Sequence, residues 1–333
     1  MKYLLTGVAG FIGSEVCLAL LQRGEEVVGI DNLNDYYDVL LKESRLAKLH
    51  EFSNFIFRKI SVENRDAIAE LNAEYQFEYI IHLAAQAGVR YSIENPEAYI
   101  DSNLVGFGNI LELARKQSVR HLVYASSSSV YGENGKQPFS EQDNVDHPVS
   151  LYAATKKANE AMAHSYSHLY DIPATGLRFF TVYGPWGRPD MAPFLFTDAI
   201  LGNRPINVFN HGNMARDFTY IDDVVDGVLL ALNAIPTKHG GMMGSSLNDT
   251  TACFQVLNVG NSQPVKLMDF IQAIERFSGK KAKMNFMDMQ KGDVPSTYAD
   301  ISQLRTLTGY SPKTSIEDGV QATVSWYREY YGL

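Results

Sequence analysis

The chain has 333 residues, which indicates about two domains, or one domain with an added lobe, and enough residues for a large core. Its 29 lysines and arginines and 38 acidic residues give a net charge of −9, which argues against nucleic acids and anionic membranes as partners. Two cysteines, Cys17 and Cys253, are too few for a disulfide framework or a structural zinc site, so no metal is expected. No apolar stretch reaches the ~18 residues that a membrane span requires. A strand predicted from residue 2 leaves no room for a signal peptide, so we expect a cytoplasmic protein.

The start of the chain predicts a strand, a glycine-rich turn and a helix, at residues 2–6, 7–13 and 14–23. Gly7 permits the tight turn, Gly10 lets backbone N–H groups approach phosphates, and Gly13 lets the helix pack against the strand. The helix N-terminus favours an anion. The spacing is G-x-x-G-x-x-G, which predicts a pyrophosphate site, although three glycines alone also fit an ordinary turn.

A second predicted strand, residues 27–31, ends in Asp31, at about the ~20-residue offset where a carboxylate binds the adenosine ribose hydroxyls. This carboxylate would repel a 2′-phosphate, and Asn32, Leu33 and Asn34 supply no arginine to bind one. The sequence therefore predicts NAD rather than NADP. The alternative interpretation makes Asp31 a turn residue after a strand.

Strand and helix patterns alternate through the first half of the chain. The predicted order is helix 40–49, strand 55–60, helix 65–75, strand 79–85, helix 96–116, strand 121–126 and helix 151–170. This alternation predicts an α/β fold, a doubly wound parallel sheet whose ligands lie beyond the carboxyl ends of the strands.

The pattern loosens after about residue 178, where prolines and glycines break the chain into shorter pieces. We expect residues 1–178 to form the Rossmann domain. Residues 179–333 are expected to form a smaller mixed α/β lobe that binds the substrate, with some segments returning to the first domain. Residues 237–251 have the composition of a turn or linker and predict a mobile surface loop.

Tyr152 and Lys156 lie four residues apart on the predicted helix 151–170, so their side chains share one face, about one turn apart. An ammonium near a phenol lowers the pKa of the phenol, which makes it a usable general base near neutral pH. Alone, this spacing also fits a solvated helix face. The serines at 126–129 end the preceding predicted strand and favour the catalytic interpretation. Beside a nicotinamide, serine, tyrosine and lysine can move a proton and a hydride together.

The chain resembles the extended short-chain dehydrogenase/reductases, and among them the NAD-dependent nucleotide-sugar epimerases, from residue 1 to about residue 327. The short motifs that carry this resemblance are Gly7, Gly10, Gly13, Asp31, His82 to Ala85, Ser127, Tyr152 and Lys156. Five longer segments most resemble UDP-glucuronate 4-epimerases: 31–37, 85–91, 180–188, 216–223 and 292–300.

The resemblance implies a site residue by residue. It implies a catalytic set of Tyr152, Lys156 and Ser127. It implies that NAD contacts Gly7, Gly10, Phe11, Ile12, Gly13, Asp31, Asn32, Leu83, Ala84, Ala85, Asn103, Tyr152 and Lys156. It implies that a UDP-sugar contacts Ser127, Ser128, Ser129, Arg90, Thr181, Arg188, Arg216 and Asp293, with Arg216 facing the phosphates and Asp293 the uridine ribose.

Substitutions within the site separate the relatives. Sugar-nucleotide dehydratases carry an Asp-Glu pair after the catalytic hydroxyl, and UDP-glucuronate decarboxylases carry a glutamate there, whereas this chain has Ser128 and Ser129. UDP-galactose 4-epimerases usually have asparagine at the position of Thr181 and lack the segment 186–188. The expected reaction is therefore reversible C4 epimerisation of UDP-glucuronate and UDP-galacturonate through a 4-keto intermediate.

Arg188 is the residue expected to recognise the uronate, because a guanidinium holds a carboxylate with two parallel hydrogen bonds. Oxidation at C4 makes a β-keto acid, which loses CO2 when the breaking bond aligns with the carbonyl π system. A carboxylate fixed by Arg188, Thr181 and the serines at 127–129 would stay out of alignment. An ordinary surface arginine in a Pro/Gly loop is the alternative.

Several alternatives remain open from the sequence. The substrate could be a neutral UDP-hexose or a UDP-N-acetylhexosamine, the outcome could be decarboxylation or net oxidation, and a non-catalytic NAD-binding regulator could use the same fold. The resemblance also implies a homodimer in which the helices at 96–116 and 151–170 form a four-helix bundle. Its expected apolar surface comprises Phe107, Ile110, Leu111, Met162, Tyr166 and Leu169, with burial inside the monomer as the alternative.

Overall fold

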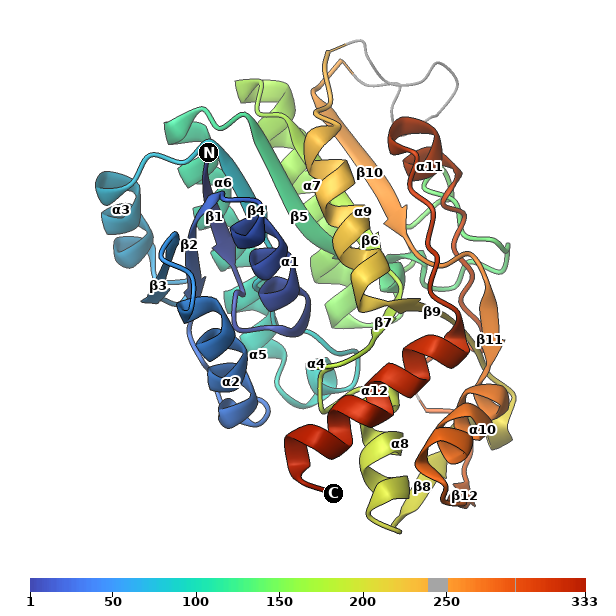
Figure 1. The fold of residues 1–333 in the computed structure, drawn as a ribbon. Helices are drawn as coiled ribbons and strands as arrows, with labels where there is room; N and C mark the ends of the chain where they lie inside the picture. Colours follow the sequence, from blue (N-terminus) through green and yellow to red (C-terminus); the bar gives the residue numbers. More distant parts are fainter. Residues whose placement is uncertain (239–250, 291) are drawn as a thin grey trace.

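The structure is a computed structural model that describes residues 1–238, 251–290 and 292–333 (Figure 1). Most of the loop predicted at 237–251 lies outside the described residues. Within the described chain the central sheet has seven strands, all paired in parallel, in the order β10-β6-β5-β4-β1-β2-β3. Their bounds are β1 Lys2–Thr6, β2 Glu26–Asp31, β3 Phe55–Lys59, β4 Tyr79–His82, β5 His121–Ser127, β6 Ala174–Phe179 and β10 Phe254–Val259. The predicted doubly wound parallel sheet is confirmed.

Helices cover both faces of this sheet (Figure 1). One face packs against α1 (Phe11–Gln22), α2 (Val39–His50), α9 (Ile221–Asn233) and α11 (Ser302–Thr308). The other packs against α3 (Arg65–Glu74), α6 (Gly106–Gln117) and α7 (Leu151–Tyr170). Strands buried on both sides are continuous apolar runs rather than alternating ones, as the parallel arrangement requires. Cys17 is buried in the first of these cores, and Cys17 and Cys253 are both free thiols.

The second half of the chain builds a smaller lobe, the lower right of Figure 1. Its strands are β7 (Thr181–Tyr183), β9 (Ala215–Tyr220) and β11 (Pro264–Lys266) in one sheet, and β8 (Pro205–Val208) and β12 (Lys283–Phe286) in another. Its helices are α8 (Ala192–Leu201), α10 (Leu267–Ser278) and α12 (Ile316–Tyr331). Because β10 pairs with β6, this half also returns to the central sheet.

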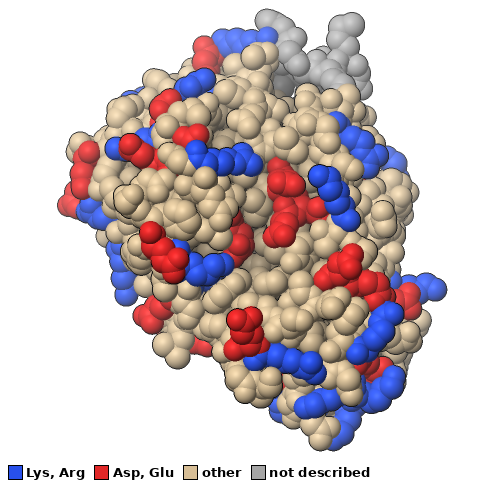
Figure 2. Space-filling view, viewed as in Figure 1, with Lys and Arg blue, Asp and Glu red and all other residues tan. Residues whose placement is uncertain are grey.

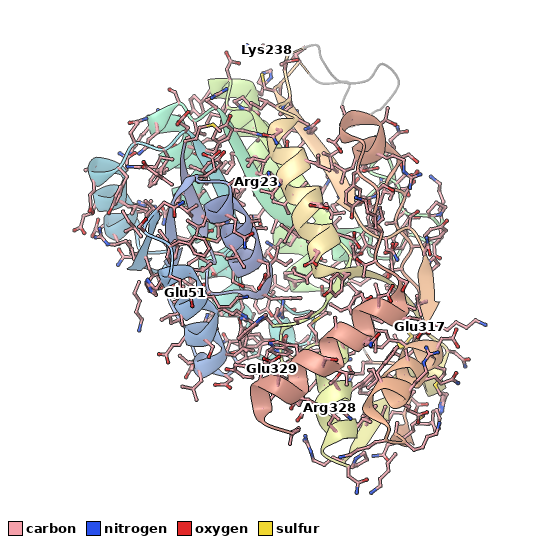
Figure 3. The ribbon with its side chains drawn as sticks, in the orientation of Figure 1. Arg23, Glu51, Lys238, Glu317, Arg328 and Glu329 are labelled. Atoms are coloured by element: carbon pink, nitrogen blue, oxygen red, sulfur yellow. The ribbon has the colours of Figure 1, made fainter. Side chains whose placement is uncertain are left out.

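Helix α12 crosses the lobe from Glu317 to Glu329 (Figure 3). Arg328, near its end, donates a hydrogen bond to the carbonyl oxygen of Ser278 at the end of α10, over 2.6 Å. This contact ties the carboxyl end of the chain to the lobe. On the face of the molecule in Figure 2, lysines and arginines are interspersed with acidic residues. None of the described helices combines the length and apolarity needed to cross a membrane.

The helix predicted at 96–116 differs from the prediction. It comprises α5 (Pro96–Tyr99), a π-helical turn at Ile100–Val105 and then α6, and it follows the short helix α4 (Tyr91–Glu94). π-Helical turns are rare and recur near functional sites. Here the turn contains Asn103, whose carbonyl oxygen accepts a hydrogen bond from the Asn159 amide of α7 at 2.7 Å. The turn therefore fixes this segment to α7.

The apolar surface predicted on this helix is also wrong at three positions. Phe107, Ile110 and Leu111 are on the inner face of α6 and are fully buried in the core between the sheet and its helices. Met162 and Tyr166 are partly buried against the same core, and Leu169 is 64% exposed. The amphipathic pattern of α6 thus reflects packing within the monomer.

Candidate active site

A cavity of about 340 Å³ lies at the carboxyl ends of the central strands, where a parallel sheet is expected to bind its ligand. Its walls are the turn after β1, the ends of β2 and β5, the loop after β4, the start of α7 and the start of the lobe. The predicted site residues that line it are Gly7, Gly10, Phe11, Ile12, Gly13, Asp31, Asn32, Leu83, Ala84, Ala85, Ser127, Ser128, Ser129, Tyr152, Lys156, Thr181 and Arg188.

The glycine turn leaves no space for side chains. Gly7 has φ +73°, a conformation that L-residues rarely adopt, and a Cβ there would lie 2.7 Å from the backbone nitrogen of Ala84. A Cβ on Gly13 would lie 2.0 Å from the carbonyl oxygen of Gly7, so α1 approaches β1 as closely as backbones allow. Gly10 caps α1 without a side-chain hydrogen bond. The first N–H groups of α1 are thus left to bind an anion.

Asp31 lines the cavity at the end of β2. Its two carboxylate oxygens accept hydrogen bonds from the backbone nitrogens of Ala9, at 3.1 Å, and Leu33, at 2.9 Å. Burial raises the pKa of this carboxyl, and the hydrogen bonds and Lys42 oppose that rise. Each oxygen keeps a lone pair for a ribose hydroxyl. Lys42 is a cation that sequence reasoning missed, but its ammonium already donates to the side-chain and backbone oxygens of Asn34.

Together these features fit the adenosine and pyrophosphate of a dinucleotide. The close approach of Gly13 to Gly7 creates the flat cradle, and Asp31 stands where the ribose would lie. The described residues contain no group of three or more His, Cys, Asp or Glu side chains placed to hold a metal ion.

Tyr152 and Lys156 meet the cavity from the first turns of α7. The Lys156 ammonium donates to the carbonyl oxygen of Ala125 on β5, over 2.8 Å, and burial lowers the pKa of Lys156 to about 8. Burial raises the pKa of Tyr152, while a hydrogen bond with Ser127 and the charge of Arg188 oppose that rise. This direction contradicts the predicted lowering by Lys156. The cost of burying a phenolate exceeds the stabilisation by the Ser127 hydrogen bond and the Arg188 charge, and the charge of Asp190 adds to the rise in pKa.

The three serines lie at the carboxyl end of β5, of which Ser127 is the last residue. Ser127 Oγ accepts a hydrogen bond from the Ser129 backbone nitrogen and donates one to Ser129 Oγ, both over 3.1 Å. Ser127, Ser128 and Ser129 all line the cavity, so they present hydroxyls without a carboxylic acid. The site therefore lacks the acid that eliminating water would need at these positions.

A buried ion pair joins β6 and α7 and binds Ser126 at the carboxyl end of β5. Arg178 on β6 donates to both oxygens of Glu160 on α7, each over 2.8 Å, and Ser126 Oγ donates to the same carboxylate over 2.7 Å. All three side chains are buried. Sequence reasoning missed this network, because its members share no local motif.

Arg188 lines the cavity but is already paired. Its Nε and Nη2 donate to the two carboxylate oxygens of Asp190, over 3.0 and 2.5 Å. The charge of Arg188 holds the pKa of Asp190 below its usual value, so the pair is ionised. An arginine alone was predicted here, and its partner stands two residues along the chain.

The loop that carries Arg188 is fixed to the cofactor turn by Arg45 of α2. This buried guanidinium donates to the carbonyl oxygens of Trp186, at 2.6 Å, and Gly187, at 3.2 Å. It also donates to the carbonyl oxygen of Ala9, at 2.9 Å, inside the glycine turn. One side chain thereby joins the two halves of the cavity, and no sequence motif pointed to it.

Four predicted site residues do not line the cavity. Asn103 is buried behind it, where its side chain bonds the backbone of Gln86 and the hydroxyl of Thr155, so it supports the wall. The other three lie close together next to the cavity, where Arg90 follows Val89, a residue that lines it. Arg90 donates a hydrogen bond to the Asp293 carboxylate at 3.4 Å, and its guanidinium lies over the ring of Phe209. Burial lowers the pKa of Arg216, the charge of Arg90 lowers it further, and the charge of Asp293 opposes this.

Comparison with known proteins places this chain in a family. The model of the NAD dependent epimerase/dehydratase family matches residues 3–243. The chain is 55% identical over 333 residues to "Protein CapI" of Staphylococcus aureus, covering 99% of each chain. It is 49% identical over 336 residues to "UDP-glucuronate 4-epimerase 2" of Arabidopsis thaliana, covering 99% of this chain and 76% of that protein.

Among solved structures, UDP-glucuronic acid 4-epimerase from Bacillus cereus in complex with UDP-glucuronic acid and NAD superimposes with a TM-score of 0.89. It is 35% identical, and the match covers 99% of this chain and 100% of that chain. The match therefore extends over almost the whole fold, including the elements that carry the cavity. The chain belongs to the NAD dependent epimerase/dehydratase family, the epimerases of the extended short-chain dehydrogenase/reductases.

Proposed function

We propose that this enzyme interconverts UDP-glucuronate and UDP-galacturonate by inverting the configuration at C4. The carrying observation is the cavity lining, which includes Arg188, Thr181 and the three consecutive serines 127–129 together with Tyr152, and this donor set contains no acid. Such a donor set suits a carboxylate on the sugar. The named function of the Arabidopsis relative and the uronate bound in the Bacillus structure support this substrate.

Bound NAD supplies the acceptor and donor of a hydride at C4, and its positively charged nicotinamide favours the phenolate of Tyr152. The chain's own residues hold the dinucleotide through the cradle of Gly7, Gly10 and Gly13 and through Asp31. We infer that residues 1–178 form this cofactor domain and that residues 179–333 form the UDP-sugar lobe, with β10 returning to the central sheet.

Tyr152 acts as the general base that takes the proton of the C4 hydroxyl, with Ser127 as the bridge between them. Lys156, fixed by Ala125, keeps a positive charge beside the nicotinamide ribose and the phenol. After oxidation at C4 the sugar turns about its link to the diphosphate and presents the opposite face of C4. The proton and the hydride then return, and the configuration is inverted.

The keto intermediate is a β-keto acid, so its carboxylate must be held away from the orientation that releases CO2. Arg188, Thr181 and the serines at 127–129 hold it there in the two bound orientations, before and after the sugar turns. The cluster of Arg90, Arg216 and Asp293 anchors the UDP, which keeps a turning sugar on the enzyme.

Wild-type enzyme incubated with UDP-glucuronate and no added cofactor will form UDP-galacturonate, which is followed through the sugar protons by NMR. Tyr152→Phe removes the base and will lower the rate by at least ~10²–10⁴-fold while NAD stays bound. Tyr170→Phe, which removes an exposed hydroxyl from the same helix, will leave the rate unchanged. Near-normal turnover by Tyr152→Phe would show that another group is the base.

Arg188→Ala will impair UDP-glucuronate far more than UDP-glucose, because only the uronate carries the carboxylate that Arg188 binds. Steady-state rates with both sugars measure this selectivity, and CO2 release is measured in parallel, since a loosened carboxylate can reach the orientation for decarboxylation. The assignment fails if the wild-type enzyme converts UDP-glucose well and leaves UDP-glucuronate untouched, and the neutral UDP-hexose then becomes the substrate.

Gly13→Ala will lower the NAD that the purified protein retains, because its Cβ would lie 2.0 Å from the Gly7 carbonyl oxygen and force α1 away from β1. Denatured protein is analysed for released dinucleotide by chromatography, which also distinguishes NAD from NADP. Gly135→Ala is the matched control, since nothing lies within 4 Å of a Cβ there. Release of NADP from the wild type would contradict the role given to Asp31.

We propose a homodimer through α6 and α7, with a corrected set of contacts. The exposed apolar side chains on this side of the sheet include Val105, 42% exposed before α6, and Leu169, 64% exposed near the end of α7. On α7, the partly exposed side chains of Met162 and Tyr166 belong to the same proposed contact surface as Leu169.

Light scattering at micromolar concentration will give the mass of a dimer for the wild type and of a monomer for Leu169→Glu, which places a charge in the apolar contact. Leu40→Glu is the matched control, because Leu40 is 66% exposed on α2 and outside this surface. A monomeric wild type would rule out the dimer.

We further propose a cytoplasmic enzyme of polysaccharide biosynthesis. Two buried free thiols suit a reducing compartment, and UDP-galacturonate is an activated sugar of the kind that glycosyl transfer consumes.

A further inference from the structure

The Arg188–Asp190 pair is built into the substrate wall. Asp190 accepts the Nε and Nη2 hydrogen bonds of Arg188 side-on, and the Tyr36 hydroxyl donates to the same carboxylate over 3.0 Å. Arg188 and Tyr36 line the cavity, whereas Asp190 is not among the described residues that line it. The carboxylate thus holds one edge of the guanidinium, away from the ligand.

The other edge of the guanidinium stays available. A guanidinium has five N–H donors, of which Asp190 uses two. The described residues give Arg188 no further hydrogen-bond partner, so Nη1 and the second N–H of Nη2 can still bind a sugar carboxylate bidentately. A substrate carboxylate bound there shares the single positive charge with Asp190.

We propose that Asp190 is a built-in counter-charge that weakens the hold of Arg188 on the sugar carboxylate, so that the sugar can leave the arginine and turn between the two half-reactions. This proposal rests on the proposed uronate substrate. Asp190 acts through Arg188 and is therefore a positioning residue.

The loop geometry makes this release necessary. The carboxylate is attached at C5 and moves with the ring when the ring turns. Arg188 cannot follow it, because Arg45 fixes the backbone at Trp186 and Gly187 to α2 and to the glycine turn. If Arg188 bound the carboxylate most tightly in the ground state, turnover would slow, because only interactions that are stronger in the transition state accelerate a reaction. A partly neutralised Arg188 guanidinium still selects and orients the uronate, but the sugar carboxylate can dissociate from it.

The test is Asp190→Asn, which keeps the volume of the side chain and removes its charge. Affinities are measured by calorimetry in the Tyr152→Phe background, so that no sugar is converted during titration. The dissociation constant for UDP-glucuronate will fall about tenfold, equivalent to ~1.4 kcal/mol, while that for UDP-glucose stays within about twofold. With Tyr152 intact, kcat for UDP-glucuronate will fall, because the sugar carboxylate leaves Arg188 more slowly and the turn of the ring is delayed.

The chain offers a matched control at Asp198, which also pairs with an arginine, Arg204, at 2.6 Å and accepts a tyrosine hydroxyl, that of Tyr327, at 2.6 Å. Asp198 is not among the described residues that line the cavity, so Asp198→Asn will change neither affinity nor kcat. Asp190→Ala removes the same charge and serves if the asparagine variant does not accumulate as folded protein.

Weaker or unchanged binding of UDP-glucuronate by both Asp190 variants would overturn the proposal, as would equal tightening for both sugars or an unchanged kcat. Failure of the proposed function is separate, because it would appear as a wild-type enzyme that neither binds nor converts UDP-glucuronate.

Discussion

The active site depends on the locked carboxyl ends of two neighbouring strands, β1 and β4. Thr6 Oγ1 hydrogen-bonds His82 Nδ1 over 2.8 Å and accepts the backbone nitrogen of Ala84 over 3.1 Å. His82 is fully enclosed, and burial lowers its pKa to about 3, so it stays neutral across the physiological range. β4 ends at His82, and residues 83–85, for which the sequence predicts a continued strand, form part of the cavity wall instead. Because the central strands are all parallel, the glycine turn, the serines and Thr181 meet at this edge although they are far apart in the chain.

The parts of the site that the sequence predicted are those with short, local causes. The spacing of Gly7 and Gly13, the position of Asp31 and the one-turn separation of Tyr152 and Lys156 follow from backbone geometry alone, and all these residues line one cavity. The supporting contacts could not be predicted in this way. Arg178 reaches Glu160 across two elements, and Arg45 reaches a loop 141 residues further along the chain. Such pairs depend on how elements pack, which no periodicity in the sequence encodes.

The errors in prediction have the same origin. A stripe of Phe107, Ile110 and Leu111 predicts an apolar face but does not say whether the monomer or a partner covers it, and here the monomer does. The lysine near Tyr152 predicts a lowered pKa, but the sign depends on how deeply the phenol is buried and on where the ammonium is bound. Lys156 is held by the carbonyl oxygen of Ala125, and burial dominates.

Arg45 explains how a site made from two parts of the chain keeps one geometry. Its guanidinium is fully buried, which would be costly without partners, yet it donates to the Ala9, Trp186 and Gly187 carbonyl oxygens and to the Tyr37 hydroxyl. A shift of the glycine turn must therefore strain the Trp186 loop, where Trp186 already has φ +63°. The same side chain that aligns the cofactor turn keeps Arg188 in place, so mobility during the reaction is left to the sugar. A rigid cavity wall allows the substrate to turn only if its strongest contact, that of Arg188 with the sugar carboxylate, is weakened. The carboxylate of Asp190, which is bound to the same guanidinium, is placed to weaken it.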